Sequence, residues 1–228
     1  MLDNLDSRAL RRTDCYGQRF MKPGTYRYTI LPPHGHLLSD DRPFTVEVSD
    51  RSKEEMEQHN VIVRFADGKF EPDRETVTID AGDLVLWNCP GTAAVPYVVA
   101  GEKEFFASDR LRNECGFSHA FGFAGEYHWT DAYGSGASGV VRVTNPDCKE
   151  MDDFQRWRKA LSKGTIVTLT DGKADPREVD VMVGQTVFFA VVTGPGVSIT
   201  DERLLGRTDD KDGPPKGRDK DKKKKRKK

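Results

Sequence analysis

The feature that most constrains this chain is an internal repeat whose parts are spread unevenly along it. Residues 61–87 resemble residues 166–189, because both carry Asp-Gly-Lys, then a proline, an alternating apolar segment, a Gly-x-x-Val turn and a second apolar segment. Residues 108–130 resemble residues 9–29, which share Leu-Arg, a Cys, a Phe and Gly-x-Tyr in the same order. Such self-similarity indicates an architecture built from repeated units.

The order of the repeated halves predicts two units, one of them split between the chain ends. Residues 60–147 contain a front half followed by a back half, and we interpret them as a complete domain. Residues 1–50 hold only a back half and residues 164–206 only a front half, so we expect these two pieces to form the second unit. Self-association by strand exchange between chains is the alternative, because an incomplete sandwich leaves open strand edges.

The pattern within residues 60–147 is all β. Short segments rich in Val, Thr and aromatic residues alternate in polarity and are separated by turns that contain Gly, Pro or Asp. We expect strands at residues 61–65, 76–79, 84–87, 96–99, 119–123, 126–130 and 138–143. This number of short strands in so short a segment is typical of a Greek-key β-sandwich.

Residues 148–163 form the exception to the strand pattern. Their apolar positions recur at helical spacing: Met151, Phe154, Trp157 and Leu161. Acidic residues near the start and basic residues near the end suit the helix dipole, so we predict a linker helix packed between the two units. Residues 51–59 are expected to be a connector with a shorter helix.

The net charge of −1 conceals two oppositely charged parts. Residues 216–228 carry ten basic and two acidic residues, whereas the rest of the chain carries 26 basic and 35 acidic. Residues 207–228 are nearly free of apolar side chains, which predicts a disordered basic tail. It ends in an unbroken run of cations: Lys222, Lys223, Lys224, Lys225, Arg226, Lys227 and Lys228.

A cationic run of this kind binds polyanions by releasing their counterions. The expected partner is an acidic protein surface or a larger assembly, a cytoskeletal polymer included, and nucleic acid or an anionic surface is the alternative. Because no aromatic residue interleaves with the lysines, binding should not depend on base sequence.

Several segments together resemble the cupredoxin family, the fold of plastocyanin-type blue copper proteins. The segments are Phe70-Glu71-Pro72 and residues 77–88, 121–129 and 139–143. The resemblance implies tandem Greek-key β-sandwiches. Blue copper proteins of that family carry a type 1 copper site, in which two histidines and a cysteine thiolate bind the metal with a weak methionine ligand.

The ligand positions that the resemblance implies carry other residues in this chain. Tyr97 stands where the first histidine would be, Asp131 where the cysteine would be, and Ala137 near the methionine position. In the unit expected from the chain ends, Ser198 and Ile30 take the histidine and cysteine positions. Since the soft ligands are missing from both sets, we expect no copper and no other cofactor.

One loop offers an alternative metal site. Pro33-His34-Gly35-His36 places two imidazoles two residues apart, and Asp40 or Asp41 would supply a third donor. A copper-binding electron-transfer or metal-handling role at His34 and His36 is therefore an alternative function, although a solvated loop with incidental histidines explains the same residues.

The remaining features exclude several classes of function. No apolar run approaches the ~20 residues of a membrane span, and the acidic first residues do not resemble an export signal. The four cysteines form no C-x-x-C pair, so we expect reduced thiols. No nucleophile, phosphate-loop or zinc-protease motif is present, and we predict that the chain is not an enzyme.

These inferences combine into one functional hypothesis. The chain is expected to be a non-catalytic structural or interaction protein, built on copper-free cupredoxin-like domains, that docks to an acidic partner partly through its tail. The alternatives are the metal-handling protein and a regulatory protein that binds nucleic acid or an anionic surface. The expected location is cytoplasmic, including cytoskeletal, ciliary or nuclear sites, and not secreted.

Overall fold

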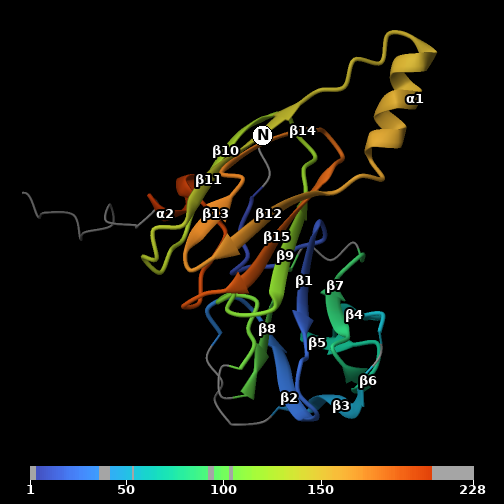
Figure 1. Ribbon diagram of the computed structural model, residues 1–228, viewed down its shortest axis with the longest axis vertical. Helices are drawn as coiled ribbons and strands as arrows, with labels where there is room; N and C mark the ends of the chain where they lie inside the picture. The colour runs from blue at the N-terminus through green and yellow to red at the C-terminus, as the bar shows by residue number, and fades with distance from the viewer. Residues whose placement is uncertain (1–3, 36–41, 53, 92–94, 103–104, 207–228) are drawn as a thin grey trace, which may run out of the picture.

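A computed structural model describes residues 4–35, 42–52, 54–91, 95–102 and 105–206. The described chain is mostly β, as predicted, with three sheets and two helices, α1 (Met151–Ala160) and α2 (Glu202–Leu205) (Figure 1). The predicted tail and its cationic run, together with His36, Asp40 and Asp41, lie outside the described residues.

The three sheets use sixteen strands. The eight-stranded sheet has the order β13 (Lys173–Asp175), β12 (Thr165–Thr170), β15 (Thr186–Thr193), β9 (Cys115–Ala120), β1 (Asp14–Arg19), β7 (Leu84–Asn88), β4 (Gln58–Ala66) and β5 (Lys69–Pro72). One four-stranded sheet comprises β6 (Thr76–Ala81), β3 (Phe44–Ser52), β2 (Gly24–Leu31) and β8 (Val98–Gly101). The other comprises β14 (Glu178–Met182), β11 (Ser138–Thr144), β10 (Gly125–Thr130) and β16 (Thr200–Asp201).

Each half of the eight-stranded sheet packs against one four-stranded sheet. In the first sandwich, Tyr28 of β2 meets Trp87 of β7 with ring centroids 5.4 Å apart. In the second sandwich, Trp129 of β10 meets Phe189 of β15 at the same distance. These buried aromatic pairs occupy equivalent positions in the repeat, so the two cores are built on the same plan.

An approximate twofold axis relates the two sandwiches. It passes through the antiparallel pair β1–β9, in which Tyr16 lies opposite its repeat equivalent Phe117. Beside this pair, a β carbon on Gly116 would lie 2.2 Å from the ring of Phe188, so only glycine lets that ring lie across the strand. The shared strand pair makes one continuous sheet, and we therefore expect the two sandwiches to unfold together.

The halves of the repeat combine differently from the prediction. The front half at residues 61–87 pairs with the N-terminal back half through β1–β7 and the parallel pair β3–β6. The front half at residues 166–189 pairs with the back half before it, through β15–β9 and β11–β14. Both sandwiches thus run from back half to front half. We predicted a complete domain at residues 60–147, enclosed by a unit made of residues 1–50 and 164–206. The observed pairing corrects this prediction, because each back half combines with the front half that follows it.

The repeat pattern could not decide between these pairings because either one supplies the same set of strands. In the structure the short connection from Ser52 of β3 to Gln58 of β4 lies within the first sandwich, and the connection from Gly101 of β8 to Cys115 of β9 leads into the second. The connector was also expected to hold a short helix. Its described residues 54–57 are irregular instead, and His59 lies in β4.

The two ends of the described chain nevertheless meet over a short stretch. Residues 5–7 bond to residues 199–201 of the second sandwich, just as residues 106–108 bond to residues 99–101 of the first. The matching bonds are Ser7 N–H to Ile199 O (2.9 Å) and Ser108 N–H to Val99 O (3.0 Å). Each sandwich is therefore completed by a segment that precedes the first strand of the other.

The predicted helix forms as α1, but it does not pack between the sandwiches. Figure 1 shows it extending away from the sheets. Its C-terminal end is attached to the β14–β15 turn, where Trp157 donates from Nε1 to the Val183 carbonyl at 2.9 Å. Met151 at its other end is 69% exposed, because no element of the second sandwich reaches that far.

Candidate functional site

The structure regroups the residues at the positions where the cupredoxin resemblance would place copper ligands. Ser198 joins Asp131 and Ala137 in the second sandwich, whereas Tyr97 joins Ile30 in the first. This regrouping follows from the corrected pairing of the halves. In each sandwich the histidine and cysteine positions now lie near each other, as they would in a metal site, but neither set contains a soft ligand.

Asp131 uses its carboxylate to hold the backbone of the second sandwich. Its Oδ1 accepts from the N–H of Ser198 at 2.8 Å and of Tyr133 at 3.1 Å, and its Oδ2 accepts from the N–H of Ser135 at 2.7 Å. Burial by itself would raise the pKa of Asp131, but these bonds outweigh it and lower the pKa. The carboxylate acts as a fixed anchor between the β10–β11 loop and the strand at Ser198.

The first sandwich fills the corresponding region with buried side chains. Tyr97 is fully buried, and desolvation raises the pKa of its phenol well above the ordinary value, with nearby Cys89 and Cys15 adding to the shift. Ile30 is 5% exposed and purely apolar. Neither residue presents a metal ligand, because a buried neutral phenol and an alkyl group cannot replace imidazole and thiolate.

His34 reaches a small cavity at the junction of the sandwiches. The cavity has a volume of about 250 Å³, and its polar lining includes Arg8, Asp109 and Tyr133. His34 is exposed and lies in the loop after β2, while Tyr133 comes from the equivalent loop after β10. The predicted partners of His34, namely His36, Asp40 and Asp41, lie outside the described residues.

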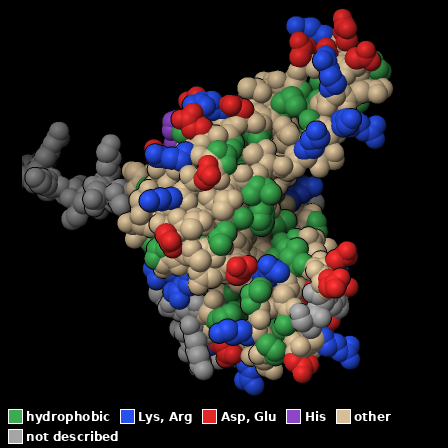
Figure 2. Space-filling view, viewed as in Figure 1, with side chains coloured by type: hydrophobic (Ala, Val, Ile, Leu, Met, Phe, Trp, Pro, Cys, Tyr) green, Lys and Arg blue, Asp and Glu red, His purple; other side chains and the backbone are tan. Residues whose placement is uncertain are grey.

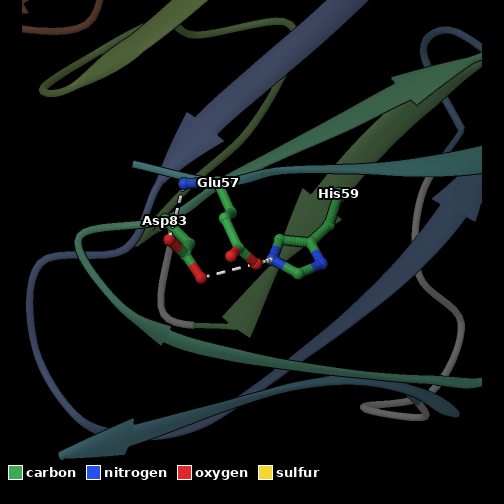
Figure 3. A group of neighbouring side chains, drawn as sticks. All are labelled: Glu57, His59 and Asp83. Atoms are coloured by element: carbon green, nitrogen blue, oxygen red, sulfur yellow. Dashed lines mark hydrogen bonds and ion pairs between the residues drawn. The ribbon is translucent and has the colours of Figure 1, made fainter. Parts of the chain in front are cut away.

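A different group of metal-binding side chains emerges at the edge of the first sandwich. Glu57, His59 and Asp83 each offer a donor atom, and these atoms lie within 4.8 Å of one another; no other such group occurs among the described residues. His59 Nε2 lies 3.2 Å from Asp83 Oδ2 and 4.0 Å from Glu57 Oε2. Figure 3 shows the imidazole and both carboxylates pointing toward one another.

Sequence reasoning missed this group because it placed His59 in a connector and did not bring Asp83 beside it. The parallel pairing of β4 with β7 creates the contact. Asp83 also holds local backbone: its Oδ1 accepts from the Glu57 N–H at 2.9 Å and its Oδ2 from the Asp80 N–H at 3.0 Å. The only local signal was the Glu-x-His spacing beside an extended segment.

The outer face of the eight-stranded sheet carries a second notable feature, an apolar stripe. Its residues point away from both cores: Leu84, Leu86, Ile166, Phe188 and Val192. Ile166 is 59% exposed and Val192 is 43% exposed, while the other three are half-buried. Figure 2 shows hydrophobic side chains gathered over the middle of this face.

All four cysteines are free thiols, in agreement with the predicted absence of disulfides. Within the described ranges, neither helix has the length and apolar composition that crossing a membrane requires. Comparison with known proteins adds no relative: no family model, curated protein or solved structure matches this chain.

Proposed function

We propose that this chain is a non-catalytic interaction protein that docks to a partner with an acidic surface. The observation that carries the proposal is the apolar stripe, because large apolar side chains on an open sheet face are typical of binding surfaces. The positions at which the cupredoxin resemblance implies copper ligands support it, since Tyr97, Ile30, Asp131 and Ser198 are buried and none of them is a soft ligand.

The charge of the partner follows from the cationic run at residues 222–228. Seven consecutive cations add long-range attraction to an acidic surface, and the stripe adds apolar contact once the partner has docked. An acidic partner with apolar or aromatic side chains among its carboxylates would satisfy both features.

Two synthetic polymers separate the electrostatic contribution of the cationic run from the apolar contribution of the stripe. We expect the full chain to bind poly-glutamate, and to bind a glutamate–tyrosine copolymer more tightly, in fluorescence titrations at several salt concentrations. Replacing residues 222–228 with glutamine should weaken both interactions by at least about tenfold at low salt, because counterion release is lost. The double substitution Ile166→Ser with Val192→Ser should weaken only the copolymer interaction.

Two results would contradict the proposal. If the double substitution left the preference for the copolymer unchanged, the stripe would not be a docking surface. If duplex DNA bound more tightly than either polymer, the nucleic-acid alternative would replace the acidic protein partner. Arg27→Ser, in an exposed part of β2, is a control for surface substitution.

Addition of copper(II) tests the expected absence of a type 1 copper site. We expect no intense blue absorption band, because neither ligand set contains the thiolate that produces it; Ile30 and Asp131 stand in its place. The measurement is an absorption spectrum of the full chain titrated with copper(II). A strong blue band at stoichiometric copper would restore the electron-transfer alternative.

A further inference from the structure

We propose that Glu57, His59 and Asp83 form a binding site for a divalent first-row transition ion. This site is distinct from the copper-ligand positions, which lie around Ile30 and Tyr97. It is also independent of the interaction surface proposed above, so either proposal can fail without the other.

The separations between the donor atoms suit one bound ion. Bonds of about 2.0–2.2 Å to nitrogen and oxygen place two ligands of the same ion roughly 3–4 Å apart. The imidazole Nε2 of His59 lies 3.2 Å from Asp83 Oδ2 and 4.0 Å from Glu57 Oε2. Small side-chain rotations would therefore bring all three donors onto one ion.

The types of donor indicate the class of ion. An imidazole nitrogen with two carboxylates suits zinc, cobalt or manganese, whereas calcium and magnesium prefer sites made of oxygen atoms. The backbone bonds to Asp83 from Glu57 and Asp80 fix the orientation of its carboxylate. Such outer contacts hold a ligand in place before the ion arrives.

Burial is graded across the site in a way that permits entry of an ion. The Asp83 side chain is 3% exposed, His59 is 24% exposed and Glu57 is 57% exposed. The innermost carboxylate is thus rigid, and the outermost one borders solvent. An ion can approach from the side of Glu57 without any change in the sheet.

The second sandwich shows that the fold does not need these donors. The registers of β4–β7 and β12–β15 make Thr165 equivalent to His59. Gln185 is equivalent to Asp83, because each follows the glycine of the matching turn. Gln185 accepts from the Met182 N–H at 2.8 Å, the same turn contact that Asp83 makes with Asp80. A neutral side chain therefore makes the turn contact in the second sandwich, where Gln185 also donates from Nε2 to the Ala160 carbonyl at 3.0 Å. The first sandwich places ionisable donors at the equivalent positions.

The repeat supplies the variant that tests the proposal. Lys163 lies two residues before Thr165, as Glu57 lies two residues before His59. The substitutions Glu57→Lys, His59→Thr and Asp83→Gln together therefore give the first sandwich the residues that the second uses at equivalent positions. This variant should fold, which circular dichroism on heating would verify. His128→Ala is the matched control, because His128 is paired with one carboxylate among the described residues, Glu126 Oε2 at 3.5 Å.

The experiment is a titration of the full chain with cobalt(II), followed by its visible absorption, and with zinc(II) in competition. We expect the wild-type chain and His128→Ala to develop the same cobalt spectrum, which zinc abolishes and excess magnesium does not. The triple variant should lose at least about tenfold in cobalt affinity. If the folded triple variant kept the wild-type spectrum and affinity, or if the wild-type chain gave no spectrum, the proposal would be overturned.

Discussion

Replacing Trp87 with alanine should lower the free energy of unfolding by about 3–5 kcal/mol, the usual cost of removing a large buried aromatic side chain. Trp87 is fully buried and lies within 5.4–5.7 Å, between ring centroids, of Tyr16, Tyr28 and Phe106. These rings come from both layers of the first sandwich and from the segment before β9. The substitution therefore removes the side chain that contacts all three rings. The free energy of unfolding would be measured by denaturant unfolding followed by fluorescence and circular dichroism.

The same experiment tests whether the sandwiches unfold together. Because β1 and β9 make one continuous sheet, Trp87→Ala should shift a single transition that covers both sandwiches. Ile166→Ala, at a position 59% exposed, is the control and should change stability by less than about 0.5 kcal/mol. Two separate transitions, with only the first one shifted, would show that the shared sheet does not couple the halves.

Replacing Asp131 with alanine should cost about 3 kcal/mol, because several backbone N–H groups of the second sandwich lose a charged acceptor. Among them is the N–H of Ser198, which is fully buried and has no access to water in the folded chain. Asp131→Asn retains one acceptor oxygen and should cost less. The control is Glu126→Ala, which removes an exposed carboxylate and should have little effect.

The effect of Asp131 should depend on pH in a defined direction. Its pKa in the folded chain is lower than its ordinary value of 3.8, so the carboxylate stabilises the fold fully at pH values above 3.8. The contribution is lost as the pH falls through the lower folded pKa. The stability gap between the wild-type chain and Asp131→Ala should therefore be constant near neutral pH and narrow in acid. A gap that widened below pH 4 would contradict the assigned role.

Local patterns in the sequence predicted the elements of this fold well. Alternating apolar residues indicated the strands that became β4, β6, β7, β10 and β11, since a half-buried strand needs one apolar face. The apolar spacing from Met151 to Leu161 predicted α1, since apolar residues at helical spacing form one face of a helix. The predicted strand at residues 119–123 was displaced, because β9 ends at Ala120 and Phe121 turns into the core.

The sites were harder to predict because their residues come from distant segments. Asp131 was identified as a replaced ligand, but its partner Ser198 was assigned to the other sandwich. The contact of His59 with Asp83 depends on the parallel pairing of β4 and β7, and no spacing along the chain encodes that pairing. The exposed stripe was likewise hidden, since Phe188 and Leu86 alternate with core residues on strands that are apolar on both faces.

The sequence by itself determined that this chain is all β, that it is built from a duplicated unit, and that the soft ligands of a blue copper site are absent. These properties depend on local periodicity, similarity and residue identity, which can be read without knowing any contact. Only the tertiary structure decided which half pairs with which, because both pairings bury the same apolar faces. The pairs β1–β7 and β9–β15 select one of them, and with it the grouping of Asp131 with Ser198. The contact of His59 with Asp83 needs only the β4–β7 pairing, which lies within one front half.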